Sequence, residues 1–453
     1  MRETLLVLMC WAGPGWAQDL PNDAMRLKDA VRMAMEKNQA VEAAVAAQKA
    51  AVSRVAQAQG GSLPKVNYSE SWSRSDNPVF VFSSLLTQRQ FSERNFQIGP
   101  LNRPGFLNNF QSQVIADHTI YDAGQTKHAV RAAEVTKDFS GEEVRRTQMD
   151  VTARVIRSYL DALLGAEHLK ATAQAMRSAQ AGLDRAQAVR SAGMSTDVDV
   201  LSIRVHLAGV REQQIRRGAE LDVARATLND ALGLPLDATH TLTTELRPLP
   251  LPEGLLAEYE RSALSERPEA RQVKLATRLA ENQAATARGY LLPQVGVRAA
   301  FEADRQRFYD RGGANWLVSV QLRWNLFNGF IDRARIAESK FALRRSEAEQ
   351  AQADSSIRLQ VRRAFADLRA AQQRIEVTRA SVAEAEESLR ITQNRYETGL
   401  SNVTDLLRTE TALLETRTRH LAAIHDQRLA AAMLELAAGT LTVNSEVLNE
   451  GSR

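Results

Sequence analysis

Cysteine, proline and aromatic residues are all scarce in this sequence. Its 453 residues include one cysteine and 12 prolines, and aromatic residues make up 6%. One thiol cannot form a disulfide within the chain or a site with several cysteine ligands. The low proline content, together with abundant Ala, Gln, Arg, Glu and Leu, is typical of long helices and not of a mixed globular core.

Long apolar runs and charge runs of one sign are also missing. Beyond the N-terminal segment no run reaches about 18 apolar residues, so we predict no transmembrane helix. The net charge of +4 is spread along the chain without a basic cluster, which argues against a nucleic-acid partner. The charged residues are typical of solvated helix faces.

Catalytic and metal-binding motifs are absent as well. The sequence contains no GxSxG nucleophile motif, no HExxH zinc motif and no phosphate-binding loop. The seven histidines show no metal-ligand spacing, and His420 and His425 are expected at the surface. We therefore expect no enzyme activity, no cofactor and no metal site.

Residues 1–17 are interpreted as a secretory signal peptide. The segment has a positive residue, Arg2, an apolar stretch over 4–9, and small residues at 15 and 17 that suit cleavage after Ala17. Cys10 lies inside this segment, and Met9 before it is not the small residue that lipidation needs. The mature chain is thus expected to have no thiol. An exported protein without a transmembrane helix is periplasmic, secreted or an outer-membrane β-barrel.

The chain contains one unit twice. A shift of 206 residues aligns residues near 120–234 with residues near 326–440 without a gap, so that Gly193 meets Gly399 and Gly233 meets Gly439. Upstream the shift becomes 229 residues and aligns Pro64 with Pro293. The change in shift predicts a longer insertion in the first copy, within residues 75–109, where turn residues without periodicity indicate a loop.

The repeat defines the expected domains. Residues 18–234 form the first copy, 235–255 a proline-rich linker, 256–440 the second copy and 441–453 an irregular tail. The expected fold class is mainly α with a small β part.

Each copy is expected to hold a helix, two strands and two further helices. The first helices cover about 26–60 and about 256–289, and Pro64 and Pro293 end them. Alternating apolar and polar residues then indicate two strands, most clearly over 295–301 and 316–324. Proline-free stretches over 122–192 and 328–398 predict helices of about 100 Å at 1.5 Å per residue. A shorter helix returns to Gly233 or Gly439, in a coiled-coil-like pair.

The four strands pose a physical problem if they cross a membrane. Their alternation predicts one lipid-facing and one water-facing side, but about eight strands make the smallest transmembrane barrel. An open sheet edge in lipid would leave backbone groups unpaired. Several chains must then share one barrel, and the charged helices must project from it as a hollow duct.

Three tryptophans, Trp72, Trp316 and Trp324, fall in or beside the expected strands. Aromatic side chains are typical of the two membrane interfaces of a transmembrane barrel, and we assign them this role. Core packing at the strand ends is the alternative.

These features resemble the TolC-type outer-membrane efflux proteins. The resemblance rests on the twofold repeat, on the strand-to-helix joints "YDAG" (121–124) and "FNG" (327–329), and on "RYETGLSNVTDLL" (395–407), and it covers nearly all of the mature chain. It implies a homotrimer with a shared 12-stranded barrel in the outer membrane and a helical coiled-coil barrel in the periplasm.

The resemblance also implies partners. The helical tips would contact a periplasmic adaptor protein, which joins the duct to an inner-membrane pump of a tripartite efflux or type I secretion system. The duct itself would be passive, so its sequence does not name the cargo. The alternatives are a periplasmic coiled-coil adaptor and a structural helical protein without a barrel, but an adaptor would have one helical hairpin and not two copies.

One turn per copy is expected at the helical tips, formed by Gly193 and Met194 in the first copy and by Gly399, Leu400 and Ser401 in the second. Glycine adopts a positive φ without strain, and the resemblance implies adaptor contacts at these turns. The pattern Thr196-x-x-Asp199 is a capping box, and Asn402-x-x-Asp405 is close to one. Both aspartates are therefore expected to cap helices.

The resemblance adds a gate role for residues at the tips. It implies that Asp405 belongs to a carboxylate ring at a closed periplasmic entrance, that Asp199 belongs to the bonds holding it shut, and that Tyr396 is a gating tyrosine. Two positions depart from the family pattern: Ser401 replaces an arginine partner, and Arg408 replaces a second ring aspartate, which would make the ring less cation-selective. Capping alone and capping with a gate role both remain open.

Overall fold

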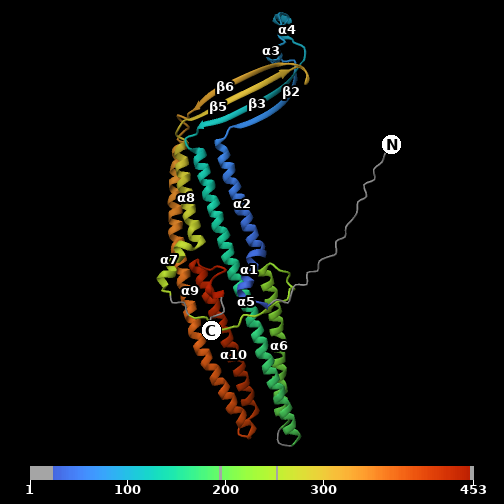
Figure 1. The fold of residues 1–453 in the computed structure, drawn as a ribbon, viewed down its shortest axis with the longest axis vertical. Helices are drawn as coiled ribbons and strands as arrows, with labels where there is room; N and C mark the ends of the chain where they lie inside the picture. The colour runs from blue at the N-terminus through green and yellow to red at the C-terminus, as the bar shows by residue number, and fades with distance from the viewer. Residues whose placement is uncertain (1–23, 193–195, 251–253, 449–453) are drawn as a thin grey trace, which may run out of the picture.

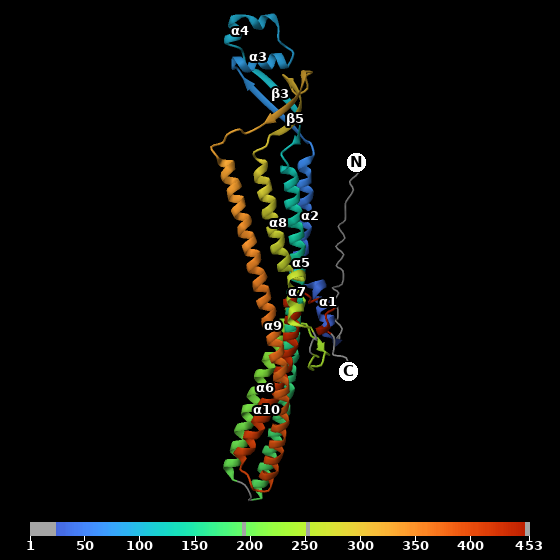
Figure 2. The same cartoon turned by 90° about the vertical axis from the view of Figure 1, so that its left-hand side faces the viewer.

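The computed structural model describes residues 24–192, 196–250 and 254–448. They form an elongated molecule with a four-stranded sheet at one end and the tips of two helical hairpins at the other (Figure 1). The two copies of the repeat run side by side along its length, as both views show (Figures 1 and 2). The expected signal peptide lies outside the described residues.

The same elements occur in both copies. The first copy comprises α1 (Leu27–Lys37), α2 (Gln39–Gln59), β2 (Lys65–Ser75), β3 (Leu107–Tyr121), α5 (Gln125–Ser191) and α6 (Asp197–Leu232). The second comprises α7 (Leu256–Glu266), α8 (Pro268–Gly289), β5 (Gln294–Arg305), β6 (Gly313–Arg323), α9 (Ile331–Glu397) and α10 (Val403–Ala438). Helices α9 and α10 begin and end 206 residues after α5 and α6, which confirms the predicted repeat and the mainly helical fold class.

The first helix of each copy is broken into two. The prediction of single helices over 26–60 and 256–289 is therefore wrong. Asn38 separates α1 from α2, because its Oδ1 accepts a hydrogen bond from Ala40 N (2.9 Å) and caps α2. Pro268 begins α8 and has no N–H with which to continue α7. The residues on both sides of each break favour helix, so the sequence pattern does not reveal the break.

The return helices end against these two breaks. A Cβ on Gly233, after α6, would lie 2.6 Å from Lys37 O, and a Cβ on Gly439, after α10, would lie 2.6 Å from Arg267 N. Both glycines also have a positive φ. Glycine at these positions therefore ends the helix and lets it pack on the backbone of the broken helix.

The sheet is antiparallel in the order β2–β3–β5–β6. Its register places Tyr68, Val114, Phe301 and Trp316 in one row across the four strands. Because successive side chains alternate between faces, this row belongs to an apolar face. The opposite face is polar and includes Asn67, Ser69, Ser71, Gln111, Gln113, Glu302, Asp304, Ser319 and Gln321. Strands β2 and β6 are the open edges.

The insertion of the first copy is more ordered than expected. Instead of a loop over 75–109, the structure has α3 (Pro78–Thr87), a 3-10 turn η2 (Glu93–Phe96) and α4 (Ile98–Asn102), and β3 already begins at Leu107. Asn77 caps α3 through its Oδ1, which accepts from Val79 N (3.0 Å). The helix is too short and too uniformly apolar to show a helical period, which explains the error.

The main core lies halfway along the molecule, where α1 and the ends of α6 and α10 meet α5. Two short strands, β1 (Ala24–Met25) and β4 (Thr241–Leu242), pair in parallel beside it. Tyr159 of α5 is fully buried there, and its hydroxyl donates to Met25 O (2.8 Å). The tail expected to be irregular includes the 3-10 turn η3 (Glu446–Leu448), and Leu441 and Leu448 are buried in the same core.

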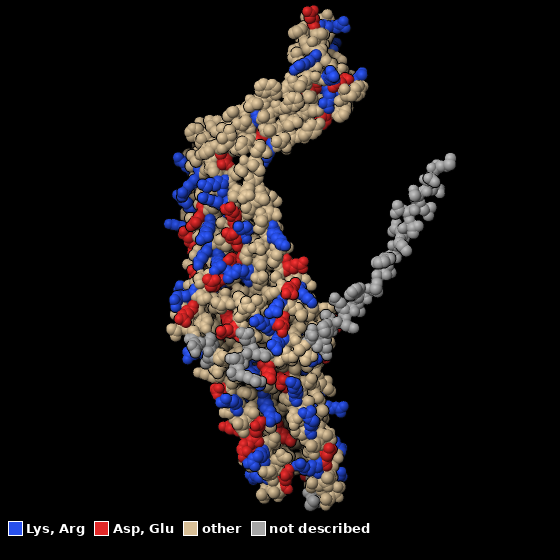
Figure 3. Space-filling view, viewed as in Figure 1, with Lys and Arg blue, Asp and Glu red and all other residues tan. Residues whose placement is uncertain are grey.

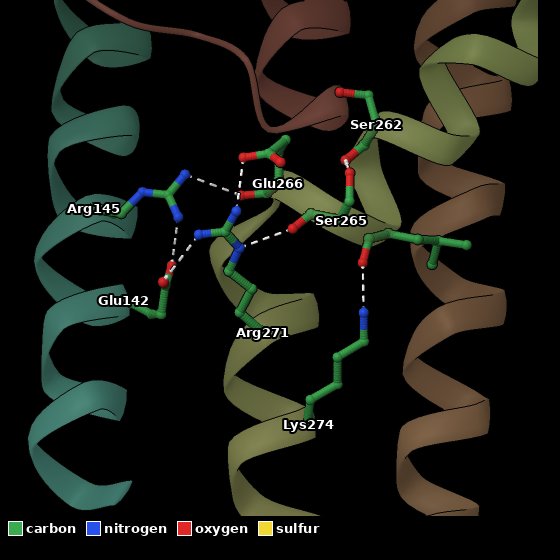
Figure 4. A network of polar contacts seen from close by, with 8 residues as sticks. Glu142, Arg145, Ser262, Ser265, Glu266, Arg271 and Lys274 are labelled. Carbon is green, nitrogen blue, oxygen red and sulfur yellow. Dashed lines mark hydrogen bonds and ion pairs between the residues drawn. The ribbon is translucent and has the colours of Figure 1, made fainter. Parts of the chain in front are cut away.

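A polar network joins the two copies near this core (Figure 4). Arg271 of α8 donates to Glu266 Oε2 at the end of α7 (2.7 Å) and to Glu142 Oε1 of α5 (3.4 Å). Arg145 of α5 donates to Glu142 Oε2 (2.8 Å) and to Glu266 O (3.1 Å). These bonds fix the break between α7 and α8 against the long helix of the other copy.

On the face drawn in Figure 3, charged side chains cover the helical part and are sparse over the sheet. None of the helices within the described ranges is both long enough and apolar enough to cross a membrane.

Candidate functional site

The α9–α10 hairpin ends in a tight turn at Gly399. Gly399 has a φ of +75°, and Leu400 N donates to Arg395 O (2.7 Å), which closes the end of α9. The Leu400 side chain is 70% exposed, whereas Ser401 is half-buried. The turn therefore presents an apolar side chain at the end of the molecule. The matching Gly193 and Met194 lie outside the described residues.

Asp199 caps its helix through its carboxylate as predicted, whereas Asp405 contributes only its backbone N to the cap of α10. Thr196 Oγ1 accepts from Asp199 N (3.2 Å), and Asp199 Oδ2 accepts from Thr196 N (3.3 Å), which is the reciprocal capping box. At the start of α10, Asn402 Oδ1 accepts from Asp405 N (2.8 Å). Acidic residues in the first helical turn also interact favourably with the helix dipole.

The carboxylate of Asp405 has different neighbours from that of Asp199. Ser401 Oγ donates to Asp405 Oδ2 (3.4 Å), and Arg408 Nη1 lies 3.9 Å from Asp405 Oδ1. The Arg408 side chain is 75% exposed, so this pair is loose and solvated. Arg408 nevertheless places a positive charge beside the predicted ring carboxylate.

Tyr396 contacts both hairpins. It packs against a small core that joins the tips, made of Leu183, Ala186, Val200, Ile203 and Val403. Burial raises the pKa of the Tyr396 hydroxyl, and the negative charge of Asp199 raises it further. The structure thus brings Tyr396 and Asp199, predicted as gate residues, near one another at the tips.

Two ion pairs at the tips were not predicted from the sequence. Arg185 of α5 pairs with Glu397 of α9, and Arg190 of α5 pairs with Asp197 of α6. The pair between Arg185 and Glu397 links the two hairpins of one chain. Its members lie 212 residues apart, and only the alignment of the two tips in space reveals it.

The three tryptophans occupy different levels of the sheet. Trp72 lies near the end of β2 remote from the helices, and Trp324 follows β6 at the helical end, where its Nε1 donates to Leu291 O (3.1 Å). Trp316 lies between these levels on the apolar face and is 78% exposed. Their contact with a membrane interface stays a prediction.

One histidine prediction is wrong. His425 is buried, with 7% of its surface exposed, and contacts Asp161 Oδ1 through Nε2 (2.8 Å) and Asp426 Oδ1 through Nδ1 (3.2 Å). It joins α10 to α5 and is not a surface residue. Among the described residues, no group of three or more His, Cys, Asp or Glu side chains is arranged to hold a metal ion.

The model of the outer membrane efflux protein family matches residues 30–234 and 261–440. The chain belongs to this family. Its members are outer-membrane efflux and secretion channels, and this chain is accordingly a channel protein of the outer membrane.

Family relatives extend over most of the chain. Protein CyaE of Bordetella pertussis is 27% identical over 372 residues, which cover 80% of this chain and 77% of CyaE. The proteases secretion protein PrtF of Dickeya chrysanthemi is 24% identical over 459 residues, which cover 97% of this chain and 92% of PrtF. The outer membrane efflux protein BepC of Brucella suis is 25% identical over 338 residues, 72% of this chain and 71% of BepC.

Solved structures share the fold of this family member. The CmeC outer membrane channel of Campylobacter jejuni matches with a TM-score of 0.79 at 14% identity, over 94% of this chain and 88% of CmeC. CusC matches with a TM-score of 0.78 at 17% identity, over 92% of each chain. At this identity the likeness concerns the fold alone.

Proposed function

We propose that this efflux protein acts as a homotrimer whose three sheets close one barrel in the outer membrane. The observation that carries the proposal is the two-faced sheet with open edges at β2 and β6. Backbone groups at an open edge cannot stay unpaired in lipid, and four strands are too few for a barrel, since about eight is the minimum. Neighbouring copies supply the missing strands.

The faces of the sheet then have separate roles. The apolar face with Phe301, Trp316 and Val318 contacts lipid, and the polar face with Ser69 and Ser319 lines the pore. Trp72 and Trp324, at opposite ends of the sheet, lie at the two membrane interfaces. The sequence pattern also assigns Trp316 to an interface, but its place between these two levels favours contact with lipid. The charged helical part extends into the periplasm.

The helical tips form the periplasmic entrance. The turns with Gly193 and Met194, and with Gly399, Leu400 and Ser401, contact a periplasmic adaptor protein. The adaptor connects the duct to an inner-membrane pump of a tripartite efflux or type I secretion system, and the pump supplies the energy. The relative PrtF, a proteases secretion protein, supports an export role, and the cargo of this chain is set by its own pump.

Membrane extraction and mass test the trimer. The protein should resist a carbonate wash of outer membranes, and its detergent complex should have the protein mass of three chains. Release by the wash, or a complex of one chain, would contradict the shared barrel.

The gate proposal concerns Asp405, with Arg408, Asp199 and Tyr396 around the same entrance. In planar bilayers, Asp405→Ala should reduce cation selectivity and block by multivalent cations, because a ring of carboxylates attracts cations. The matched control is Asn402→Ala, which removes the side chain that caps α10 and keeps the Asp405 carboxylate. Equal changes in both variants would show an effect of helix capping, and unchanged selectivity in Asp405→Ala would refute the carboxylate ring.

The adaptor contact has a separate test. Replacement of residues 400–404 by a glycine-serine segment should abolish crosslinking to the adaptor while the trimer persists. Normal crosslinking would refute the contact at this turn.

A further inference from the structure

The helical insert between β2 and β3, residues 76–106, has no counterpart in the second copy. Residues 306–312 suffice to join β5 to β6 there. The insert follows β2, yet α3 contacts β3, β5 and β6. Helix α3 therefore crosses the end of the sheet from one side to the other, beyond the strands and remote from the helical tips (Figures 1 and 2).

A buried polar chain of contacts fastens the insert to the sheet. Gln88, directly after α3, donates through Nε2 to Asn109 Oδ1 and to Asn108 O (both 2.9 Å). Asn109 Nδ2 donates to Asp304 Oδ1 (2.7 Å). Gln88 is 2% exposed and Asp304 is 1% exposed, so the contacts are shielded from water and hold the insert firmly.

The register shows which face the insert is fastened to. Asn109 pairs with Ser73, and Asp304 pairs with Gln111 and Gly313. Side chains alternate along a strand, so Asn109 and Asp304 belong to the polar face that also carries Gln111. The insert thus bends over the polar side of the sheet and away from the apolar side.

A glycine permits this close approach. A Cβ on Gly313 would lie 1.8 Å from Thr87 O, at the end of α3, which no side chain could accept without displacing the insert. Next to it, Arg89 Nη2 donates to Ala314 O (3.1 Å). Gly296, on the same face nearer the helices, offers a contrast, since a Cβ there would meet its nearest atom, His118 O, at 3.7 Å.

The insert is a packed unit and not an extended loop. Phe91 makes edge contacts with Phe82 of α3 (4.9 Å between ring centroids) and with Phe96 of η2 (5.1 Å). Such aromatic contacts fix the relative positions of the segments that carry them. The insert is therefore expected to keep one conformation at its attachment to the sheet.

We propose that the insert is a fixed lid that narrows the outer mouth of the pore. The inference rests on the proposed function, because only in a closed barrel does the polar face surround a lumen. A packed unit fastened to the polar face at the end remote from the periplasmic tips lies over that lumen. Three copies would then leave a narrower outlet than the barrel itself and limit the size of what passes.

Accessibility of a pore-facing thiol tests the lid without dependence on the periplasmic gate. Ser319→Cys places a cysteine on the polar face of β6, and Cys10, the native cysteine, lies in the expected signal peptide. Maleimides of graded size are added to whole cells that carry the full chain. A small maleimide should label Ser319→Cys whatever the state of the insert.

A large polyethylene-glycol maleimide should distinguish the variants. Combining Ser319→Cys with Gly313→Ala or Gln88→Ala should raise its labelling rate several-fold, because each change loosens the insert. The matched control is Gly296→Ala, which should leave the rate unchanged. Val318→Cys, on the apolar face, should remain unlabelled.

Three other labelling results would contradict the lid or the barrel. Equally fast labelling of the native insert and both loosened variants by the large reagent would overturn the lid. Failure of the large reagent in both loosened variants, with the small reagent still reacting, would show that the insert is not the limiting element. If even the small reagent fails on trimers, the polar face does not line an open mouth, and the proposed barrel is wrong as well.

Discussion

The two copies of the repeat have long helices of equal length, but these helices and their neighbours make different contacts. Helices α5 and α9 both have 67 residues, and α6 and α10 both have 36. The contacts diverge at the outer end, where only the first copy has an insert, in the middle and at the tips. The common elements form the sheet and the long helical pairs, and the divergent contacts mark where the two copies are not interchangeable.

The middle of the molecule shows a difference in burial between the two copies. Tyr159 of the first copy is fully buried between Met25 and Thr244. Its counterpart in the repeat, Phe365, is half-buried and rests against Tyr259, with 6.1 Å between ring centroids. The chain segments before α1 and after α6 cover Tyr159, so the first copy carries the main core.

Truncation of these two aromatic residues should give the largest difference in stability between equivalent changes in the two copies. Tyr159→Ala is expected to lower the free energy of unfolding by about 3–5 kcal/mol, the usual cost of removing a buried large side chain, and Phe365→Ala by clearly less. Tyr159→Phe, which removes the hydroxyl alone, should cost about 1–3 kcal/mol because buried polar partners lose a bond. Urea midpoints of the purified detergent complex measure all three, and equal midpoints for Tyr159→Ala and Phe365→Ala would contradict the asymmetry.

The second difference is the histidine contact of α10. Burial by itself lowers the pKa of His425, but the hydrogen bonds and charges of Asp161 and Asp426 outweigh it and raise the pKa above the usual value. Asp426 also accepts from Arg374 Nη1 of α9 (2.9 Å). The first copy has Ala219 at the equivalent position, so this contact exists once per chain.

The sign of the pH effect follows from the raised pKa. Charged His425 binds its carboxylates only in the folded state, so its stabilisation is complete below the unfolded pKa of about 6.5 and is lost as the pH rises through the higher folded pKa. His425→Gln should therefore destabilise the protein more below pH of about 6 than at pH of about 9. Thermal unfolding at both pH values measures this, and a pH-independent difference would mean that His425 acts by packing alone.

Sequence patterns revealed the features that local residues determine and missed those that depend on contacts between distant segments. The glycines at 233, 399 and 439 and the alternation along β5 and β6 act locally, so they can be read from one chain. The break at Asn38 depends on a side-chain cap and on Ala231 O, to which Asn38 Nδ2 donates (3.0 Å), from another helix. Likewise, the burial of His425 and the pair between Arg185 and Glu397 depend on which long helices lie side by side, and this is absent from the local pattern.

The smallest expected difference lies at the two helix caps of the tips. Thr196→Ala removes one bond of a reciprocal box, and Asp199 Oδ2 can still accept from the backbone N at position 196. Asn402→Ala removes the side chain that accepts from Asp405 N, while the Asp405 carboxylate is directed to Ser401 and Arg408. Loss of a cap costs about 1 kcal/mol of helix stability. We expect Asn402→Ala to lose more stability than Thr196→Ala.

Amide hydrogen exchange in the first turns of α6 and α10 reports this difference locally. Exchange should accelerate more in α10 of Asn402→Ala than in α6 of Thr196→Ala, whereas the reverse order would show that Asp405 takes over the cap. The comparison bears directly on the entrance. A carboxylate that is not needed to cap its own helix can face a pore without loss of helix stability, and this makes Asp405 a better gate candidate than Asp199.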